Sequence, residues 1–195
     1  MRSTVNAILS DYDGTLSPTQ SLRSITESIP KQLEGTLLGI AQTIPVCIVS
    51  SKDYHFIHNK AKFAWVFSCI MGIETIVLRM RKEASNEIEK RSNNGDHLSC
   101  IKERFLLPRI HKILKTNSVT LSKLAENIES EFKDNVMVKR KFTSDKKYLA
   151  GVTIDYRHLK DWKLYKNKLE PSLNEIIQKY RSLSSIPRSN LHGFP

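Results

Sequence analysis

Two aspartates separated by one residue, Asp11 and Asp13, have the residue types and the spacing to carry out chemistry. They lie in the string LSDYDGTL (residues 9–16), at the end of the apolar run VNAIL (residues 5–9). Side chains at positions i and i+2 of an extended chain point to the same side, so the two carboxylates could share a divalent cation. Oxygen ligands favour a hard cation such as Mg²⁺. A carboxylate beside a magnesium ion is an arrangement suited to phosphoryl transfer, although a DxDG string alone is also common in polar turns.

A serine pair follows a second apolar run, in the string IPVCIVSS (residues 44–51). If both runs are parallel strands, Ser50 and the aspartates meet at the carboxyl edge of the sheet, where open α/β sheets bind ligands. The hydroxyl group and the neighbouring backbone N–H groups can donate to phosphate oxygens. We therefore expect Ser50 to bind phosphate, together with Ser51 and with Gly14, which permits a tight turn and the close approach of a ligand.

Apolar patterning predicts an α/β fold with a Rossmann-like core and a parallel sheet, followed by an α+β module. The core is predicted to span residues 1–78, the module with its linker residues 79–181, and a loose tail residues 182–195. Predicted strands lie at 5–10, 44–49, 63–72, 74–78, 137–144 and 149–157, and predicted helices lie at 31–43, 52–61, 98–115, 119–133 and 161–181.

The string DYDGTL after the first strand resembles the first motif of the haloacid-dehalogenase superfamily of phosphatases. This resemblance implies that Asp11 is a nucleophile that forms an aspartyl-phosphate and that Asp13 is the general acid and base. It also implies that Mg²⁺ is held by a side-chain oxygen of Asp11 and the main-chain carbonyl of Asp13. Ser50 then corresponds to the second motif of the family.

The string SSKDYHF (residues 50–56) is similar to members of the family that act on sugar phosphates or phosphoglycerate conjugates. In the sugar-phosphate branch, which includes trehalose-phosphate phosphatases, an α+β cap follows the second motif, and residues 98–181 have a matching size and order of elements. The resemblance implies that Lys141, Tyr156 and Arg157 meet the sugar. The alternative is that they are solvent-facing strand residues.

The third and fourth motifs of the family, a lysine and an acidic pair, follow such a cap, and residues 182–195 contain neither. Gly95–Asp96 is similar to part of the fourth motif but lacks the second acid, so we interpret it as a turn. Lys52 lies close to Ser50, but the lysine of the family comes from elsewhere in the chain. We therefore expect a shortened, frameshifted or naturally degenerate member, whose exposed sheet a partner covers, for instance in a homo-oligomer.

The chain has a formal net charge of +11, which suits anionic substrates and also nucleic acid. No helix-turn-helix, RNA-binding aromatic or zinc-finger pattern accompanies this charge, so nucleic acid is the less favoured partner. No run approaches the roughly 18 apolar residues of a membrane span, and the N-terminal apolar stretch is too short for a signal peptide. We expect a cytoplasmic protein without a membrane partner. Of its three scattered cysteines, the two in apolar runs are expected to be buried thiols.

The sequence thus predicts a Mg²⁺-dependent phosphohydrolase with an aspartyl-phosphate intermediate. Its substrate would be a sugar phosphate or a similar small phosphorylated metabolite. The alternative is a catalytically impaired or truncated relative that serves as a binding or regulatory module.

Overall fold

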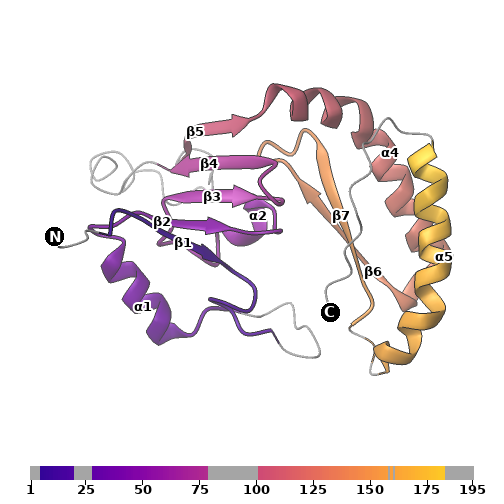
Figure 1. The fold of residues 1–195 in the computed structure, drawn as a ribbon, viewed down its shortest axis with the longest axis horizontal. Helices are drawn as coiled ribbons and strands as arrows, with labels where there is room; N and C mark the ends of the chain where they lie inside the picture. The colour runs from indigo at the N-terminus through magenta and orange to yellow at the C-terminus, as the bar shows by residue number, and fades with distance from the viewer. Residues whose placement is uncertain (1–4, 20–27, 79–100, 158, 160, 183–195) are drawn as a thin grey trace, which may run out of the picture.

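The computed structural model describes residues 5–19, 28–78, 101–157, 159 and 161–182 (Figure 1). The predicted linker with Gly95–Asp96 lies outside these residues, as do Cys100 and the predicted tail beyond residue 182.

A five-stranded sheet forms the first layer of the fold, with the strand order β1-β2-β3-β4-β5. Its strands are β1 (Ile8–Asp11), β2 (Val46–Val49), β3 (Val66–Cys69), β4 (Glu74–Leu78) and β5 (Ile101–Leu106). The first three strands are mutually parallel, β4 is antiparallel to β3, and β5 is antiparallel to β4. Four of the five strands therefore run in the same direction, which confirms the predicted α/β class with a mainly parallel sheet.

The two faces of this sheet differ in burial. Ile48, Phe67 and Ile76 lie on one face and are almost fully buried in a core to which the crossover helices α1 (Lys31–Ile40) and α2 (Tyr54–Ile57) contribute. The opposite face carries Leu9, Val49 and Phe105, which are 71%, 41% and 53% exposed. Mainly parallel sheets usually bury both faces, so this exposure is consistent with the expected partner, which stays a prediction.

A second unit follows β5 and contains two long helices and a hairpin. It comprises α4 (Pro108–Phe132), the 3₁₀ turn η3 (Lys133–Asn135), β6 (Met137–Phe142), β7 (Leu149–Asp155) and α5 (Trp162–Ser182). The strands β6 and β7 pair antiparallel as a separate two-stranded sheet. Val138 and Ile154 pack against a second apolar cluster formed by α4 and α5. Because strand residues alternate in direction, Lys139 and Lys141 lie on the other face of the hairpin.

Our prediction was wrong for the residues that lead into this unit. Residues 101–106, predicted to be helical, form the strand β5, because pairing with β4 overrides local propensity. The helix begins at Pro108, a residue type favoured in the first helical turn. The two predicted helices are a single helix, in which the buried Asn117 donates a side-chain hydrogen bond of 2.9 Å to the carbonyl of Ile113.

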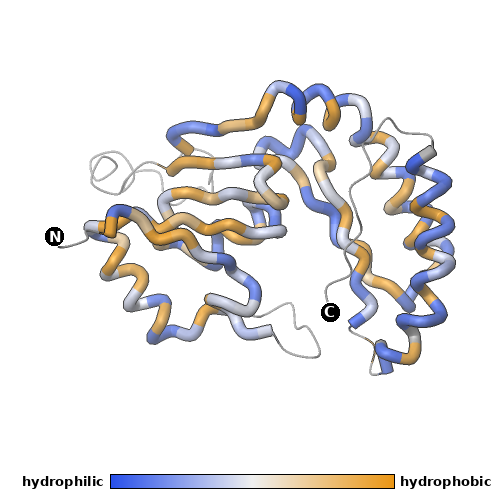
Figure 2. Tube along the Cα trace, viewed as in Figure 1, coloured by the Kyte–Doolittle hydropathy of each residue, from blue (hydrophilic) through white to orange (hydrophobic). Residues whose placement is uncertain are grey.

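The distribution of hydropathy follows this two-part architecture. Figure 2 shows hydrophobic residues concentrated along β1 to β4, whereas α4 and α5 alternate between hydrophobic and hydrophilic positions. Such alternation is expected of helices that cover one face of a hairpin and expose the other side to water. None of the described helices is long and apolar enough to cross a membrane.

Candidate active site

The acid pair lies where β1 ends, on a short turn fixed by its own backbone. Tyr12 is buried between Asp11 and Asp13, so the two carboxylates lie away from the core side of the turn. The backbone N–H of Tyr12 donates to Asp11 Oδ1 at 2.7 Å. Gly14 has a φ of 80°, which favours glycine, and its N–H donates to the carbonyl of Ser17 at 2.8 Å. The turn therefore holds both carboxylates at the end of the strand.

Ser50 lies beside this turn because of the strand register. Asp11 pairs with Val49 across β1 and β2, so the next residue, Ser50, comes at the same edge of the sheet. The N–H of Ser50 donates to the carbonyl of Ser68 at 2.9 Å, and its carbonyl accepts from the N–H of Met71 at 3.1 Å. The structure thus brings together the two sequence segments that we predicted to form the site.

Lys52 places a positive charge directly on the acid pair. Its Nζ lies 3.1 Å from Asp13 Oδ2, and the two side chains are only 17% and 20% exposed. Its ammonium group also lies 5.2 Å from the centre of the Phe56 ring. The backbone of Lys52 is held on both sides, since its N–H donates to Ser50 Oγ and its carbonyl accepts from Ile70. Sequence reasoning set this residue aside, although its position two residues after Ser50 was a usable signal.

The oxygen atoms at this edge suit a hard cation. Among the described residues there is no group of three or more His, Cys, Asp or Glu side chains that could hold a metal ion. The exposed carboxylate of Asp11 and the main-chain carbonyl of Asp13 are both oxygen donors, and Mg²⁺ commonly keeps several waters beside one or two protein ligands. The donor set therefore fits a largely hydrated Mg²⁺.

The hairpin of the second unit packs against the loops that follow β2 and β3. In Figure 1, β6 and β7 lie beyond the carboxyl ends of β1 to β3. A Cβ atom on Gly151 would lie 3.3 Å from Cγ2 of Ile70, so the backbone of β7 approaches this loop closely. The N–H of Phe142 donates to Asp53 Oδ2 at 3.4 Å, while Asp53 Oδ1 caps α2. The core-facing side of the hairpin is therefore the side that carries Gly151.

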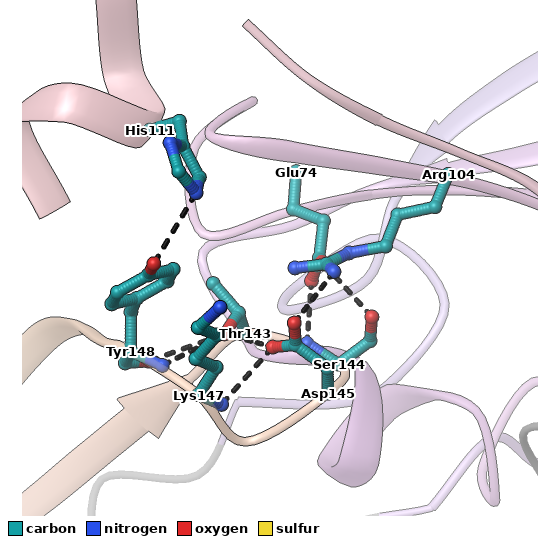
Figure 3. Close-up of polar contacts among 8 residues, drawn as sticks. All are labelled: Glu74, Arg104, His111, Thr143, Ser144, Asp145, Lys147 and Tyr148. Carbon is teal, nitrogen blue, oxygen red and sulfur yellow. Dashed lines mark hydrogen bonds and ion pairs between the residues drawn. The ribbon is translucent and has the colours of Figure 1, made fainter. Parts of the chain in front are cut away.

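A buried carboxylate joins the hairpin turn to the core sheet (Figure 3). Glu74 of β4 is fully buried and accepts from the backbone N–H of Ser144 at 2.9 Å, from Ser144 Oγ at 2.8 Å, and from Arg104 Nε. Arg104 Nη1 also pairs with Asp145 Oδ2 at 2.7 Å. Burial alone would lower the pKa of Arg104, but its hydrogen bonds with Glu74 and Asp145 outweigh that effect and raise it. These contacts fix the second unit on the core.

The predicted substrate residues of the cap do not all lie on one face. Lys141 shares the core-facing side with Gly151, since its Cδ lies 3.8 Å from the Cβ position of that glycine. Arg157 Nε donates to Asp155 Oδ1 at 3.1 Å. Tyr156 instead contacts the apolar cluster under α5 and donates to Glu170 Oε1 at 2.9 Å. Burial, followed by this hydrogen bond, raises the pKa of Tyr156 to about 12.

Asp155 organises two cations, one of which sequence reasoning missed. Besides Arg157, it pairs through Oδ2 with Lys139 Nζ at 3.3 Å. Burial would raise the pKa of Asp155, but the hydrogen bonds and charge of Arg157, with the charge of Lys139, lower it to about 2. The alternation of lysines at positions 139 and 141 was the signal in the sequence that could have identified Lys139.

Two further features lie apart from the acid pair. Cys47 and Cys69 are free thiols whose pKa is raised by burial. Cys69 is buried, as predicted, whereas Cys47 is only partly buried. A shallow cavity of about 380 Å³ lies between α4 and the hairpin and is lined partly by Phe142, Lys147 and Leu149. All of its lining residues belong to the second unit and none to the five-stranded sheet or its loops, so this cavity is separate from the candidate active site.

Neither a protein-family model nor a curated protein sequence matches this chain. Solved structures do. A trehalose-6-phosphate phosphatase related protein superposes with a TM-score of 0.60 at 16% identity, over 90% of this chain and 61% of its own. The C-terminal domain of trehalose-6-phosphate phosphatase from C. albicans superposes with a TM-score of 0.57 at 17% identity, over 89% of this chain and 51% of its own.

The chain therefore shares the fold of these two structures, an α/β core followed by an α+β unit that takes the place of the predicted cap, and this confirms the predicted resemblance at the level of fold. The chain spans between about half and three fifths of the length of these two structures.

Proposed function

We propose that the protein is a phosphomonoester hydrolase in which Asp11 is the nucleophile. The observation that carries this proposal is the pairing of Asp11 with Val49, which puts Ser50 and Lys52 beside the acid pair. A carboxylate nucleophile, a hydroxyl donor and a cation are the groups that phosphoryl transfer requires. The similar structures, which are described as a phosphatase and a phosphatase-related protein, support the same class.

The reaction proceeds in two steps at phosphorus. An oxygen of Asp11 attacks phosphorus, the ester P–O bond breaks, and Asp13 gives its proton to the leaving oxygen. A water molecule then attacks phosphorus and gives a proton to Asp13, the bond between Asp11 and phosphorus breaks, and inorganic phosphate leaves. Ser50 Oγ and the backbone N–H of Ser51 hold the phosphoryl oxygens, and Gly14, which has no side chain, allows them to approach closely.

Lys52 places its positive charge close to both Asp13 and the phosphoryl group of the substrate. Its ion pair requires Asp13 in the ionised form, which is the form that accepts a proton from water. An arriving phosphoryl group competes for the same ammonium group and so releases Asp13, which takes the proton of the bound phosphate monoanion and gives it to the leaving oxygen in the first step. Mg²⁺, held by the Asp11 carboxylate and the Asp13 main-chain carbonyl, supplies further charge neutralisation when bound.

The substrate is a sugar phosphate or a similar small phosphorylated metabolite. The cap supports this proposal because Lys141 lies on the core-facing side of the hairpin and Arg157 is held by Asp155. Tyr156 does not face the core; it packs against the apolar cluster under α5 and so supports the end of the hairpin.

The test is phosphate release from a panel of sugar phosphates with Mg²⁺, comparing wild type with Asp11→Asn. The exposed Asp11 side chain makes this change compatible with folding, and its effect should be a loss of at least about 10⁴-fold in kcat. Asp134→Asn, in the 3₁₀ turn of the cap, is a control of identical chemistry that should keep full activity. Equal rates for wild type and Asp11→Asn would exclude Asp11 as the nucleophile.

A second candidate is a binding module without turnover. It is favoured by one observation, the ion pair with Lys52 that engages the proton-transferring carboxylate of Asp13. This candidate predicts that sugar phosphates bind in calorimetry and that wild type and Asp11→Asn release no phosphate.

A further inference from the structure

We infer that Ile70 is a positioning residue of the candidate active site, which sets the place of Lys52 according to where the β6–β7 hairpin packs. This inference rests on the proposed function, because it concerns how the ammonium group used in the proposed reaction is placed.

The turn between β3 and β4 holds the segment that carries Lys52 by main-chain hydrogen bonds. The N–H of Ile70 donates to the carbonyl of Lys52 at 2.9 Å, and the N–H of Met71 donates to the carbonyl of Ser50 at 3.1 Å. Within the segment, the N–H of Lys52 donates to Ser50 Oγ at 3.1 Å. Because two successive donors of one turn bind this short segment, a shift of the turn is passed to the backbone of Lys52.

This turn has a backbone conformation that its residue types disfavour. Ile70 and Met71 have φ values of 51° and 58°, and a positive φ is exceptional for a β-branched residue such as isoleucine. A tight turn with two such φ values between paired strands favours asparagine and glycine. Strain of this kind persists only where surrounding contacts hold the backbone, so the packing of the Ile70 side chain is decisive.

The hairpin supplies a close contact to that side chain. Ile70 is 4% exposed and belongs to the main apolar cluster. A Cβ atom on Gly151 of β7 would lie 3.3 Å from Ile70 Cγ2, which is closer than the best distance between two carbon atoms. The glycine at position 151 therefore leaves Ile70 in its present place. Since the Met71 side chain is 75% exposed, Ile70 is the residue of the turn that the hairpin holds.

The hairpin is itself fixed on the core, so it is a stable reference for this contact. Glu74 accepts from the N–H and the hydroxyl group of Ser144 in the hairpin turn. Asp53, the residue after Lys52, accepts from the N–H of Phe142 at 3.4 Å and also caps α2. Lys52 is therefore held next to the hairpin through Asp53 as well as through the turn.

The position of the Lys52 backbone determines where its charge lies. The ammonium group is 3.1 Å from Asp13 Oδ2, and the two side chains are only 17% and 20% exposed, which leaves Lys52 little room to take another course. A misplacement of about 1 Å can cost about 10²-fold in rate. A shift of a few tenths of an ångström, which a Cβ atom at Gly151 would impose on its neighbour, should therefore cost about tenfold.

The test is a pair of reciprocal substitutions. Gly151→Ala adds the Cβ atom that crowds Ile70, and Ile70→Leu removes the Cγ2 atom that this Cβ would meet. With Mg²⁺ and a sugar phosphate that wild type hydrolyses, we expect Gly151→Ala to lower kcat/KM about tenfold and the double variant to recover most of the loss. Gly39→Ala, where a Cβ atom has no neighbour within 4 Å, is the matched control and should keep full activity.

A double-mutant cycle shows whether the effect passes through Lys52. In a Lys52→Met background, Gly151→Ala should lower kcat/KM by less than about twofold, because the charge that it displaces is already gone. If Gly151→Ala does not fold, Ile70→Leu alone is the second variant, and its loss of about threefold should likewise disappear in Lys52→Met. No loss in Gly151→Ala, a loss that Ile70→Leu does not recover, or an equal loss in both backgrounds would overturn the inference and leave the phosphatase proposal intact.

Chemical labelling of Lys52 separates this inference from the proposed function. At a limiting concentration, acetic anhydride labels a shielded lysine that is engaged in an ion pair more slowly than an exposed one. Mass spectrometry measures the labelling of Lys52 relative to the exposed Lys123. We expect Gly151→Ala to raise this ratio about threefold, as the loss of a partly exposed ion pair would give, and the double variant to reverse the rise. If wild type hydrolyses no sugar phosphate, the phosphatase proposal fails and the labelling decides the inference: an unchanged ratio in Gly151→Ala would overturn it.

Discussion

Replacing Glu74 with glutamine tests how the cap is held on the core. The carboxylate is fully buried and has three donors, Arg104 Nε, Ser144 Oγ and the N–H of Ser144. Two of these donors belong to the hairpin turn and one to β5, so a single side chain links three parts of the fold. Glutamine has nearly the same shape but no charge and only one acceptor oxygen.

The magnitude of the effect follows from what the glutamine cannot do. Its amide nitrogen must face either the N–H of Ser144 or the donors on the other side, so at least one buried donor loses its acceptor. An unsatisfied buried group costs about 1–3 kcal/mol, and the contact with charged Arg104 is weakened as well. Because Arg104 keeps Asp145, the full cost of an unpaired buried charge does not arise. We expect Glu74→Gln to lower the free energy of unfolding by about 2–4 kcal/mol.

Urea denaturation followed by tryptophan fluorescence measures this change. Trp65 donates from Nε1 to the carbonyl of Ala41 at 3.0 Å, so its emission reports on the core. Glu103→Gln, at an exposed position next to Arg104, is the matched control and should change stability by less than about 0.5 kcal/mol. If Glu74→Gln were no more destabilising than Glu103→Gln, the buried contacts in Figure 3 would not fix the cap.

Three further predictions concern the charged groups of the site and the cap. The pKa of Asp155 falls from 3.8 to about 2 on folding, so its stabilising contribution is complete above the higher value and is lost as the pH falls through the lower one. Because Lys139 and Arg157 are partly exposed, we expect this lost contribution to be only about 1–2 kcal/mol. The free energy of unfolding, measured as the pH is lowered, should show the loss in wild type and not in Asp155→Asn. Curves of the same shape for the two proteins would contradict this prediction. In steady-state kinetics, Lys52→Met should lower kcat/KM by about 10²-fold, whereas Lys52→Arg should retain part of the activity. Equal losses in both variants would argue against an effect of charge. Chelation with EDTA should abolish phosphate release, and added Mg²⁺ should restore it; activity that survives chelation would exclude the metal.

The core and the location of the acid pair were predictable because their signals are local. Parallel strands appear as short continuous apolar runs; one such run ends at Asp11 and another is followed directly by Ser50. Once two neighbouring strands are parallel, their carboxyl ends must meet at one edge. The register that pairs Asp11 with Val49 puts Asp11 and Ser50 at that edge.

The contacts that position the cap were not predictable because they join residues far apart in the chain. Glu74 and Ser144 are separated by 70 positions, and neither residue type indicates a partner. The strand β5 depends on pairing with β4, so its sequence alone, IKERFL, did not distinguish strand from helix.

The placement of Tyr156 and Arg157 shows a different limit. We assigned both to one substrate surface, but adjacent residues at the end of a strand point to opposite sides. Tyr156 accordingly packs toward α5, while Arg157 pairs with Asp155.

The most direct test of the central claim is to trap the covalent intermediate. Wild type is mixed with Mg²⁺ and a substrate that it hydrolyses, quenched during turnover, and treated with borohydride, which reduces an aspartyl-phosphate to homoserine. Mass spectrometry of the peptide that contains LSDYDGTL should show homoserine at position 11 in wild type and unmodified asparagine there in Asp11→Asn. Homoserine at another aspartate, or turnover by Asp11→Asn, would contradict the assignment of Asp11 as the phosphorylated residue.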